Sequence, residues 1–180
     1  MKIKDNTLIS VEGTDIINGK FIVPKEVIRI GDNVFENRSN LEEIDTSNVE
    51  VIGVGAFRDC KNLKKVNMPH LKDIWNSAFS NCTSLPCPNN KIRAEICELA
   101  LKYLNEDMSM GLCYYLNMAI TDAIIKYKQA ICLQTCFPLF TYQNAKEKFR
   151  ATGWKYDFWR PMENKEIRKK FLKWCFENKK

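Results

Sequence analysis

Apolar residues in the first half of the chain recur in columns that are 22 residues apart. Three columns keep this spacing throughout: Phe35/Phe57/Phe79, Leu41/Leu63/Leu85 and Ile30/Ile52/Ile74. A fixed period in the low twenties, with apolar positions in register, is typical of a leucine-rich solenoid whose coils bury their apolar side chains against one another. The pattern predicts three stacked coils between Val27 and Cys87, with the phenylalanine rings forming a spine.

The positions between these columns predict short parallel strands with polar outer faces. The outward positions that we take as candidate partner-binding residues are Glu42, Glu43, Lys64 and Lys65. Glu42 lies one repeat from Lys64, and Glu43 lies one repeat from Lys65, and neighbouring strands are only ~4.8 Å apart. These charges therefore either neutralise one another across the strands or bind a partner.

Residues 1–26 precede the regular units and predict a cap for the first coil. Leu8–Val11 and Lys20–Val23 are short apolar or alternating segments on either side of Asn18-Gly19, a dipeptide typical of tight turns. We expect two short strands there, because the end of a repeat stack exposes apolar surface that an atypical segment has to cover.

The sequence changes character at Pro86-Cys87-Pro88, where two prolines end the repeats. Beyond this point Asn90 is a candidate helix cap. Apolar spacing and turn residues predict helices over 91–105, 112–127, 141–153 and 163–179. The predicted fold is therefore α+β: a short leucine-rich-repeat solenoid with its N-terminal cap over residues 1–88, followed by a small, basic, all-helical domain over residues 89–180 that caps the C-terminal end of the solenoid.

The repeat units resemble BspA-type leucine-rich repeats, whose pattern is roughly I-G-x-x-A-F-x-x-C-x-x-L-x-x-I-x-x-P. The residues of the second unit that match are Gly53, Ala56, Phe57, Cys60, Leu63, Val66 and Pro69. The first unit departs from the pattern at Val34 and Arg38, and the third unit departs at Trp75, where glycine is usual. The resemblance covers about the first half of the chain and implies a solenoid that binds through a stacked face, without naming a partner.

A second resemblance, between the C-terminal half and small uncharacterised phage and prophage proteins, concerns the end of the chain. The matching residues are Gly153, Trp159, Pro161, Arg168, Phe171 and Leu172, together with Gly111-Leu112-Cys113. This resemblance implies at most an origin in a mobile element.

Charge is unevenly distributed along the chain. The net charge of +6 is the sum of −1 over residues 1–90, −2 over residues 91–125 and +9 over residues 126–180. A basic tail interleaved with aromatic residues is typical of a segment that contacts an acidic protein surface or nucleic acid, although solvated helix faces give the same pattern. The candidate contact residues in this tail are Trp154, Lys155, Tyr156, Trp159, Arg160, Arg168, Lys169 and Lys173.

Compartment and chemistry are constrained by what the sequence contains. It shows neither a signal-peptide pattern nor an apolar run long enough to span a membrane, so we expect a cytoplasmic protein with no membrane contact and with mostly buried, reduced thiols among its eight cysteines. The cysteine spacings do not fit a zinc site, and the single histidine, His70, has no predicted catalytic partner. We therefore expect no metal, no cofactor and no catalytic residue.

These patterns favour a non-enzymatic protein-interaction module that acts by binding a partner macromolecule, most simply another protein. One alternative is a phage- or prophage-encoded inhibitor of a host defence system such as an RNA-guided nuclease, in the manner of an anti-CRISPR protein. A second alternative is direct binding of nucleic acid, or of a nucleoprotein complex, through the basic C-terminal half.

Overall fold

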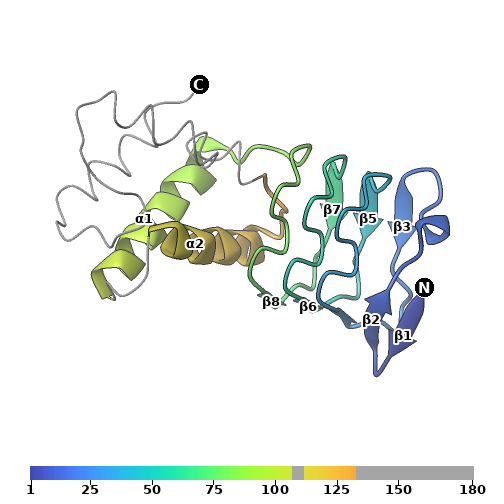
Figure 1. Ribbon diagram of the computed structural model, residues 1–180. Coiled ribbons are helices and arrows are strands. Elements are labelled where there is room, and N and C mark those ends of the chain that lie inside the picture. Colours follow the sequence, from blue (N-terminus) through green and yellow to red (C-terminus); the bar gives the residue numbers. More distant parts are fainter. Residues whose placement is uncertain (107–111, 133–180) are drawn as a thin grey trace. The chain divides into compact units, whose positions relative to one another are not determined.

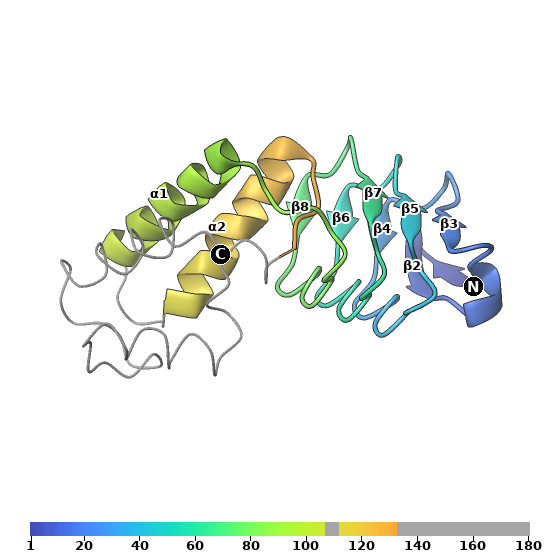
Figure 2. The same ribbon diagram turned by 90° about the horizontal axis from the view of Figure 1, so that it is seen from above.

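Repeating coils form the first half of the computed structural model, which describes residues 1–106 and 112–132; the predicted helices over 141–153 and 163–179 lie outside this part (Figures 1 and 2). Each coil adds one strand to each of two sheets. The larger sheet contains, in spatial order, β1 (Lys2–Lys4), β2 (Thr7–Ser10), β4 (Arg29–Ile30), β6 (Val51–Ile52) and β8 (Asp73–Ile74). The smaller sheet contains β3 (Lys20–Ile22), β5 (Glu43–Asp45) and β7 (Lys65–Asn67).

All strand pairs between successive coils are parallel, and the register advances by one repeat at each step. Ile30 lies opposite Ile52, and Ile52 lies opposite Ile74, so the isoleucine column of the sequence is a row of neighbouring strands. In the smaller sheet Ile44 lies opposite Val66. The predicted solenoid of short parallel strands, followed by helices, is thus confirmed.

The phenylalanine spine is also present. Phe35, Phe57 and Phe79 are buried, and their ring centroids are 5.1 and 5.0 Å apart with interplanar angles of 10° and 2°. Phe21 of β3 continues the column edge-on, with its centroid 5.1 Å from that of Phe35. The ring spacing matches the ~4.8 Å spacing of neighbouring strands, so one aromatic ring per coil fills the space between the two sheets.

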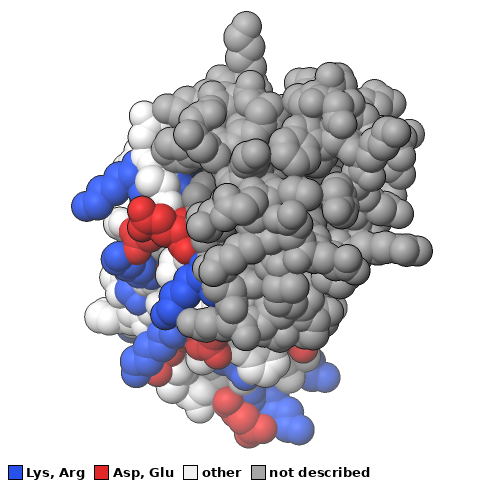
Figure 3. All heavy atoms as spheres, turned by 90° about the vertical axis from the view of Figure 1, so that its left-hand side faces the viewer, with Lys and Arg blue, Asp and Glu red and all other residues white. Residues whose placement is uncertain are grey.

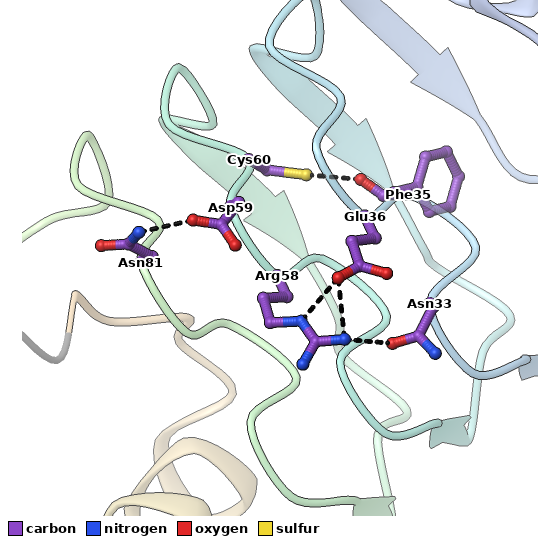
Figure 4. A network of polar contacts seen from close by, with 7 residues as sticks. All are labelled: Asn33, Phe35, Glu36, Arg58, Asp59, Cys60 and Asn81. Atoms are coloured by element: carbon purple, nitrogen blue, oxygen red, sulfur yellow. Dashed lines mark hydrogen bonds and ion pairs between the residues drawn. The ribbon is translucent and has the colours of Figure 1, made fainter.

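A column of side-chain donors ties each coil to the backbone of the one before it. Cys60 Sγ donates to the Phe35 carbonyl oxygen at 2.9 Å (Figure 4). Cys82 Sγ donates to the Phe57 carbonyl oxygen at 3.0 Å. Arg38 occupies this column in the first unit, where its guanidinium donates to the Val11 carbonyl oxygen. Arg38 and Val11 are 27 residues apart in the sequence, whereas each cysteine and its acceptor are 25 residues apart. The spacing differs because the segment before the first regular coil is a cap, and the longer arginine side chain still reaches the Val11 carbonyl oxygen.

The N-terminal cap differs from the expected pair of strands. The hairpin is formed by β1 and β2, and its turn at Asp5 and Asn6 has φ values of 48° and 56°. Asn18 and Gly19 do form a tight turn, with an antiparallel bridge between Ile17 and Lys20. The strand that follows this turn, β3, pairs in parallel with β5. It is therefore the first strand of the smaller sheet, because the parallel ladder of the repeats already begins at Lys20.

The helices lie close to their predicted positions. α1 spans Asn90–Glu106, α2 spans Leu112–Tyr127, and a 3-10 helix spans Gly13–Asp15 in the cap. The side chain that caps α1 is Asn89, whose Oδ1 accepts from the Ile92 N–H at 3.0 Å; the expected cap, Asn90, is the first helical residue. Because two asparagines are adjacent, the sequence alone does not decide which of them caps the helix.

Residues 121–132 belong to the same compact unit as the coils, whereas residues 88–120 belong to a second unit. Within the first unit, the Cys132 N–H donates to the Pro86 carbonyl oxygen at 3.3 Å, and Lys128 Nζ donates to the Leu71 carbonyl oxygen. Ile124 and Ile131 of this segment are buried. Helical residues were expected to cap the last coil, but the assignment of this segment to the compact unit of the coils was not predicted. The division into domains over 1–88 and 89–180 stays a prediction.

The spine gives a direct test of the stacked core. Replacing Phe57, the middle ring, with alanine is expected to lower the free energy of unfolding by about 3–5 kcal/mol, because the cavity would lie between two stacked rings. The control is Ile17→Ala, at a side chain that is 69% exposed, which should change stability by less than about 0.5 kcal/mol. If urea unfolding gave the same free energy of unfolding for both variants, the stacked phenylalanine rings would not be a main source of the stability of the coils.

A glycine at the start of the second coil tests how closely the coils approach. A Cβ atom built on Gly53 would lie 2.8 Å from the carbonyl carbon of Gly31, whereas one built on Gly13 would meet nothing within 4 Å. Gly53→Ala is therefore expected to cost about 1–3 kcal/mol of stability through steric overlap, and Gly13→Ala is expected to be nearly neutral. Thermal unfolding of both variants compares them, and a neutral Gly53→Ala variant would mean that the coils are further apart.

Candidate partner-binding face

The outer face of the smaller sheet is hollowed. The hollow has a volume of about 550 Å³, and its lining comes from three neighbouring strands: Lys20, Phe21, Ile22, Glu43, Ile44, Asp45, Lys65, Val66 and Asn67. The parallel register places the outward residues in two rows, Lys20–Glu43–Lys65 and Ile22–Asp45–Asn67. This face is therefore the candidate partner-binding face of the regular coils.

The charged candidates on this part of the chain are mostly neutralised by one another. Glu42 and Lys64 form the expected ion pair across one repeat, with the Glu42 Oε2 and Lys64 Nζ atoms 2.8 Å apart. Glu43 lies opposite Lys65 in the register, but its ion pair is with Lys20 on the preceding strand, at 3.2 Å. The expected Glu43–Lys65 ion pair is therefore replaced by Glu43–Lys20, because Glu43 is the middle residue of a row with a lysine on each side.

Ion pairs across one repeat also occur on the other sides of the coils. Arg58 pairs with Glu36 at 2.8 Å and also donates to Asn33 Oδ1 (Figure 4). Lys72 pairs with Glu50 at 2.7 Å. On the described part of the surface in Figure 3, basic and acidic side chains are mixed and neither forms a large patch. Exposed pairs of this kind add little to stability, and they neutralise Glu36, Glu50, Arg58 and Lys72 within the chain.

Asp45, in the second row of the hollow, is already satisfied by its neighbours. The Ser47 hydroxyl and the Asn67 side-chain amide both donate to Asp45 Oδ1. The Ser47 hydroxyl and, to a smaller degree, the Asn67 amide hold the pKa of the Asp45 carboxyl below its ordinary value of 3.8. Asp45 is thus a fixed anion whose hydrogen bonds orient the side chains around it.

Two residues of the hollow, Ile22 and Lys65, have side chains that are not held by an ion pair with a described residue. Ile22 is 76% exposed, and Lys65 makes no ion pair with any described residue. Lys65 was a candidate from the sequence, whereas Ile22 was not, because Lys20–Val23 was interpreted as part of the cap. The β3–β5 pairing is offset by 23 residues and places Ile22 opposite Asp45, whereas the 22-residue period of the sequence gives Val23, which is buried, so the sequence pattern alone does not identify Ile22.

The candidate residues of the basic tail lie outside the described residues. They are Trp154, Lys155, Tyr156, Trp159, Arg160, Arg168, Lys169 and Lys173. Their contact with an acidic protein surface or with nucleic acid stays a prediction.

The pKa values of two thiols and two carboxyls in the described part of the chain are shifted away from neutral pH. Burial raises the pKa of the Cys60 thiol to about 12 and raises the pKa of the Cys82 thiol even further. The pKa values of Asp15 and Glu42 are lowered, chiefly by hydrogen bonds from the N-terminal amine and from Lys64 respectively. Groups poised near neutral pH are what acid–base or thiolate catalysis needs, and these four are shifted away from it.

Metal and membrane binding can be assessed only for the described residues. Within them, no group of three or more His, Cys, Asp or Glu side chains is arranged to hold a metal ion. The helices in the described ranges include none with both the length and the apolar character of a membrane span. His70 is exposed in a turn after β7.

The two-sheet coils, their aromatic spine and their 22-residue register define a leucine-rich-repeat solenoid. Residues 12–86 match the family model described as "BspA type Leucine rich repeat region (6 copies)". Repeats of this class are generally protein-interaction modules.

Among solved structures, the chain is similar to the leucine-rich repeat protein TpLRR of T. pallidum. The identity is 24% and the TM-score is 0.36, with 41% of this chain and 39% of that chain covered. The match thus spans well under half of that protein. No curated protein matches the chain.

The buried thiols give a test of the coil column in solution. Cys87 is exposed, whereas Cys60 and Cys82 are fully buried. Iodoacetamide reacts with thiolates, so we expect it to modify Cys87 at pH 7–9 and to leave Cys60 and Cys82 unmodified until the protein is unfolded in guanidinium. Because the pKa of Cys60 is about 12, its protection should persist as the pH rises through this range. Peptide mass mapping reads out each site, and early labelling of Cys60 would contradict the packing.

Proposed function

We propose that this chain is a non-enzymatic protein-interaction module that binds a protein partner in the hollow on the outer face of β3, β5 and β7. The observation that supports this proposal most directly is the hollow itself, formed by three consecutive strands of a regular ladder. A concave surface on a rigid scaffold positions side chains before binding, which reduces the entropy lost when a partner docks.

The polar groups of the hollow favour specific binding over nonspecific binding. Glu43 is paired with Lys20, and Asp45 is held by Ser47 and Asn67, so these groups present a fixed pattern of charge and hydrogen-bonding atoms. Ile22 offers the large apolar side chain, and Lys65 offers a cation that forms no ion pair with a described residue. An apolar anchor surrounded by ordered polar groups is the usual composition of a protein interface.

The partner proposed here is therefore a protein segment with an apolar side chain for Ile22 and an acidic group for Lys65. Inhibition of a host defence system and direct binding of nucleic acid remain alternative hypotheses from the sequence. No contact in the described ranges favours either of them, because both depend on residues of the basic tail. The cytoplasmic location likewise stays a prediction.

A matched pair of isoleucine substitutions tests the hollow. The tagged full chain is used to recover partners from its native host, and the recovered proteins are quantified by mass spectrometry for the wild type, Ile22→Glu and Ile17→Glu. Both isoleucines are more than two-thirds exposed, but Ile22 lines the hollow and Ile17 does not. We expect Ile22→Glu to weaken a specific partner by at least about tenfold and Ile17→Glu to retain it.

The affinity of any recovered partner is then measured with purified proteins, including a Lys65→Glu variant that reverses the unpaired charge. Equal binding by Ile22→Glu and Ile17→Glu would exclude the hollow as the contact face. Recovery of nucleic acid in place of protein, or measurable turnover by the chain, would overturn the proposed function itself.

A further inference from the structure

The outer face of the larger sheet carries an arginine and a tryptophan whose contact could not be expected from the sequence. Arg29 lies on β4, Trp75 directly follows β8, and β6 lies between these strands. The guanidinium carbon of Arg29 is 4.2 Å from the centroid of the Trp75 ring. The indole N–H of Trp75 donates to Asp73 Oδ2 at 2.8 Å, which fixes the orientation of the ring.

Trp75 takes the place of glycine in the row next to this contact. The N–H groups of Gly31, Gly53 and Trp75 donate to the carbonyl oxygens of the preceding coil at the same position of the ladder, each at 2.9 Å. The three residues therefore form one row across the sheet. Gly31 and Gly53 add no side chain to this row, whereas Trp75 adds the indole that contacts Arg29. The departure of the third unit from the repeat pattern at Trp75 thus has a structural consequence on this face.

The neighbouring row carries charge that the coils leave unneutralised. The register places Lys4, Thr7, Arg29, Val51 and Asp73 side by side on five successive strands of the sheet. In the described part of the chain, neither Lys4 nor Arg29 forms an ion pair, whereas Lys20, Arg58, Lys64 and Lys72 each do. When a guanidinium stacks on an aromatic ring, its N–H groups lie in a plane parallel to the ring and point outward. They can then bind a carboxylate through two hydrogen bonds.

Apolar surface lies next to this cation. Trp75 is 40% exposed, and Ile9, at the β2 end of the glycine row, is 42% exposed. Arginine and tryptophan are the residue types that contribute most often to the energetic centres of protein interfaces. A pre-oriented pair of this kind, beside exposed apolar side chains, has the composition of such a centre.

We propose that this arginine–tryptophan face, made of Lys4, Ile9, Arg29, Val51 and Trp75, is a second contact surface that binds an acidic segment of a protein partner. A carboxylate of the partner pairs with Arg29, a second acidic group lies near Lys4, and an apolar side chain packs against Trp75. The face is on a different sheet from the hollow, and the site does not depend on the hollow being occupied.

The balance of charge favours protein over nucleic acid as the ligand of this face. Residues 1–90 carry 11 Lys+Arg and 12 Asp+Glu, and Asp73 lies directly beside the indole. Binding of a phosphate backbone needs several cations along its path, and the row of this face holds two, Lys4 and Arg29. Two unpaired cations suit two carboxylates of an acidic protein segment.

The test observes Trp75 directly in the full-length chain. The indole N–H resonance of Trp75 is identified in nitrogen–proton correlation spectra by its loss in Trp75→Phe. The probe is a soluble peptide in which leucines are separated by pairs of glutamates, compared with its lysine counterpart and with single-stranded oligothymidine. We expect a saturable shift of the Trp75 resonance with the acidic peptide alone, and a weaker affinity at high salt.

Charge-matched variants separate this face from general attraction. Arg29→Gln should weaken the acidic peptide by about tenfold. Lys72→Gln removes the same charge from a lysine already paired with Glu50, and should change the affinity by less than about twofold. Ile22→Glu should leave peptide binding unchanged, so failure of the hollow and failure of this face are distinguished. A shift with oligothymidine, no saturable shift, or equal effects of Arg29→Gln and Lys72→Gln would overturn the proposal.

Discussion

Close contact between successive coils, at a spacing of about 5 Å, is the constraint on which the rest of the repeat structure depends. The stacked rings of Phe35, Phe57 and Phe79 have this spacing, and so do hydrogen-bonded strands. The constraint leaves no room for a Cβ atom at Gly53. It also brings the Cys60 thiol to the carbonyl oxygen of Phe35, so the buried polar groups of one coil are satisfied by the backbone of the coil before it.

The same spacing decides which surface charges remain for a partner. Side chains one repeat apart are lateral neighbours, so Glu36 with Arg58, Glu42 with Lys64 and Glu50 with Lys72 form ion pairs within the chain. Lys65 in the hollow lies opposite Glu43, which pairs with Lys20 instead, and Arg29 on the larger sheet lies between Thr7 and Val51. Neither cation forms an ion pair with a described residue, and each lies on one of the two proposed contact surfaces.

A stack of parallel strands has to end, and the two ends differ chemically. At the start, the β1–β2 hairpin supplies an antiparallel neighbour, and Arg38 reaches back to Val11 in place of a cysteine. At the other end, Pro86 has no N–H group at the position where Glu42 and Lys64 donate to the preceding coil. The ladder of the smaller sheet therefore ends at β7, and the last coil instead accepts hydrogen bonds from Lys128 and Cys132.

The repeated spacing of apolar residues is enough to predict the period, the aromatic spine, the parallel register and the helices up to Tyr127. It also predicts the Glu42–Lys64 neighbours, since they follow from the register. The folded coils add three features that the spacing does not predict: Glu43 pairs with Lys20, each coil has a second, two-residue strand, and Arg29 contacts Trp75. Strands of two residues are too short to show alternation in the sequence. A contact between side chains that are two coils apart depends on side-chain conformations, which a repeated spacing does not specify.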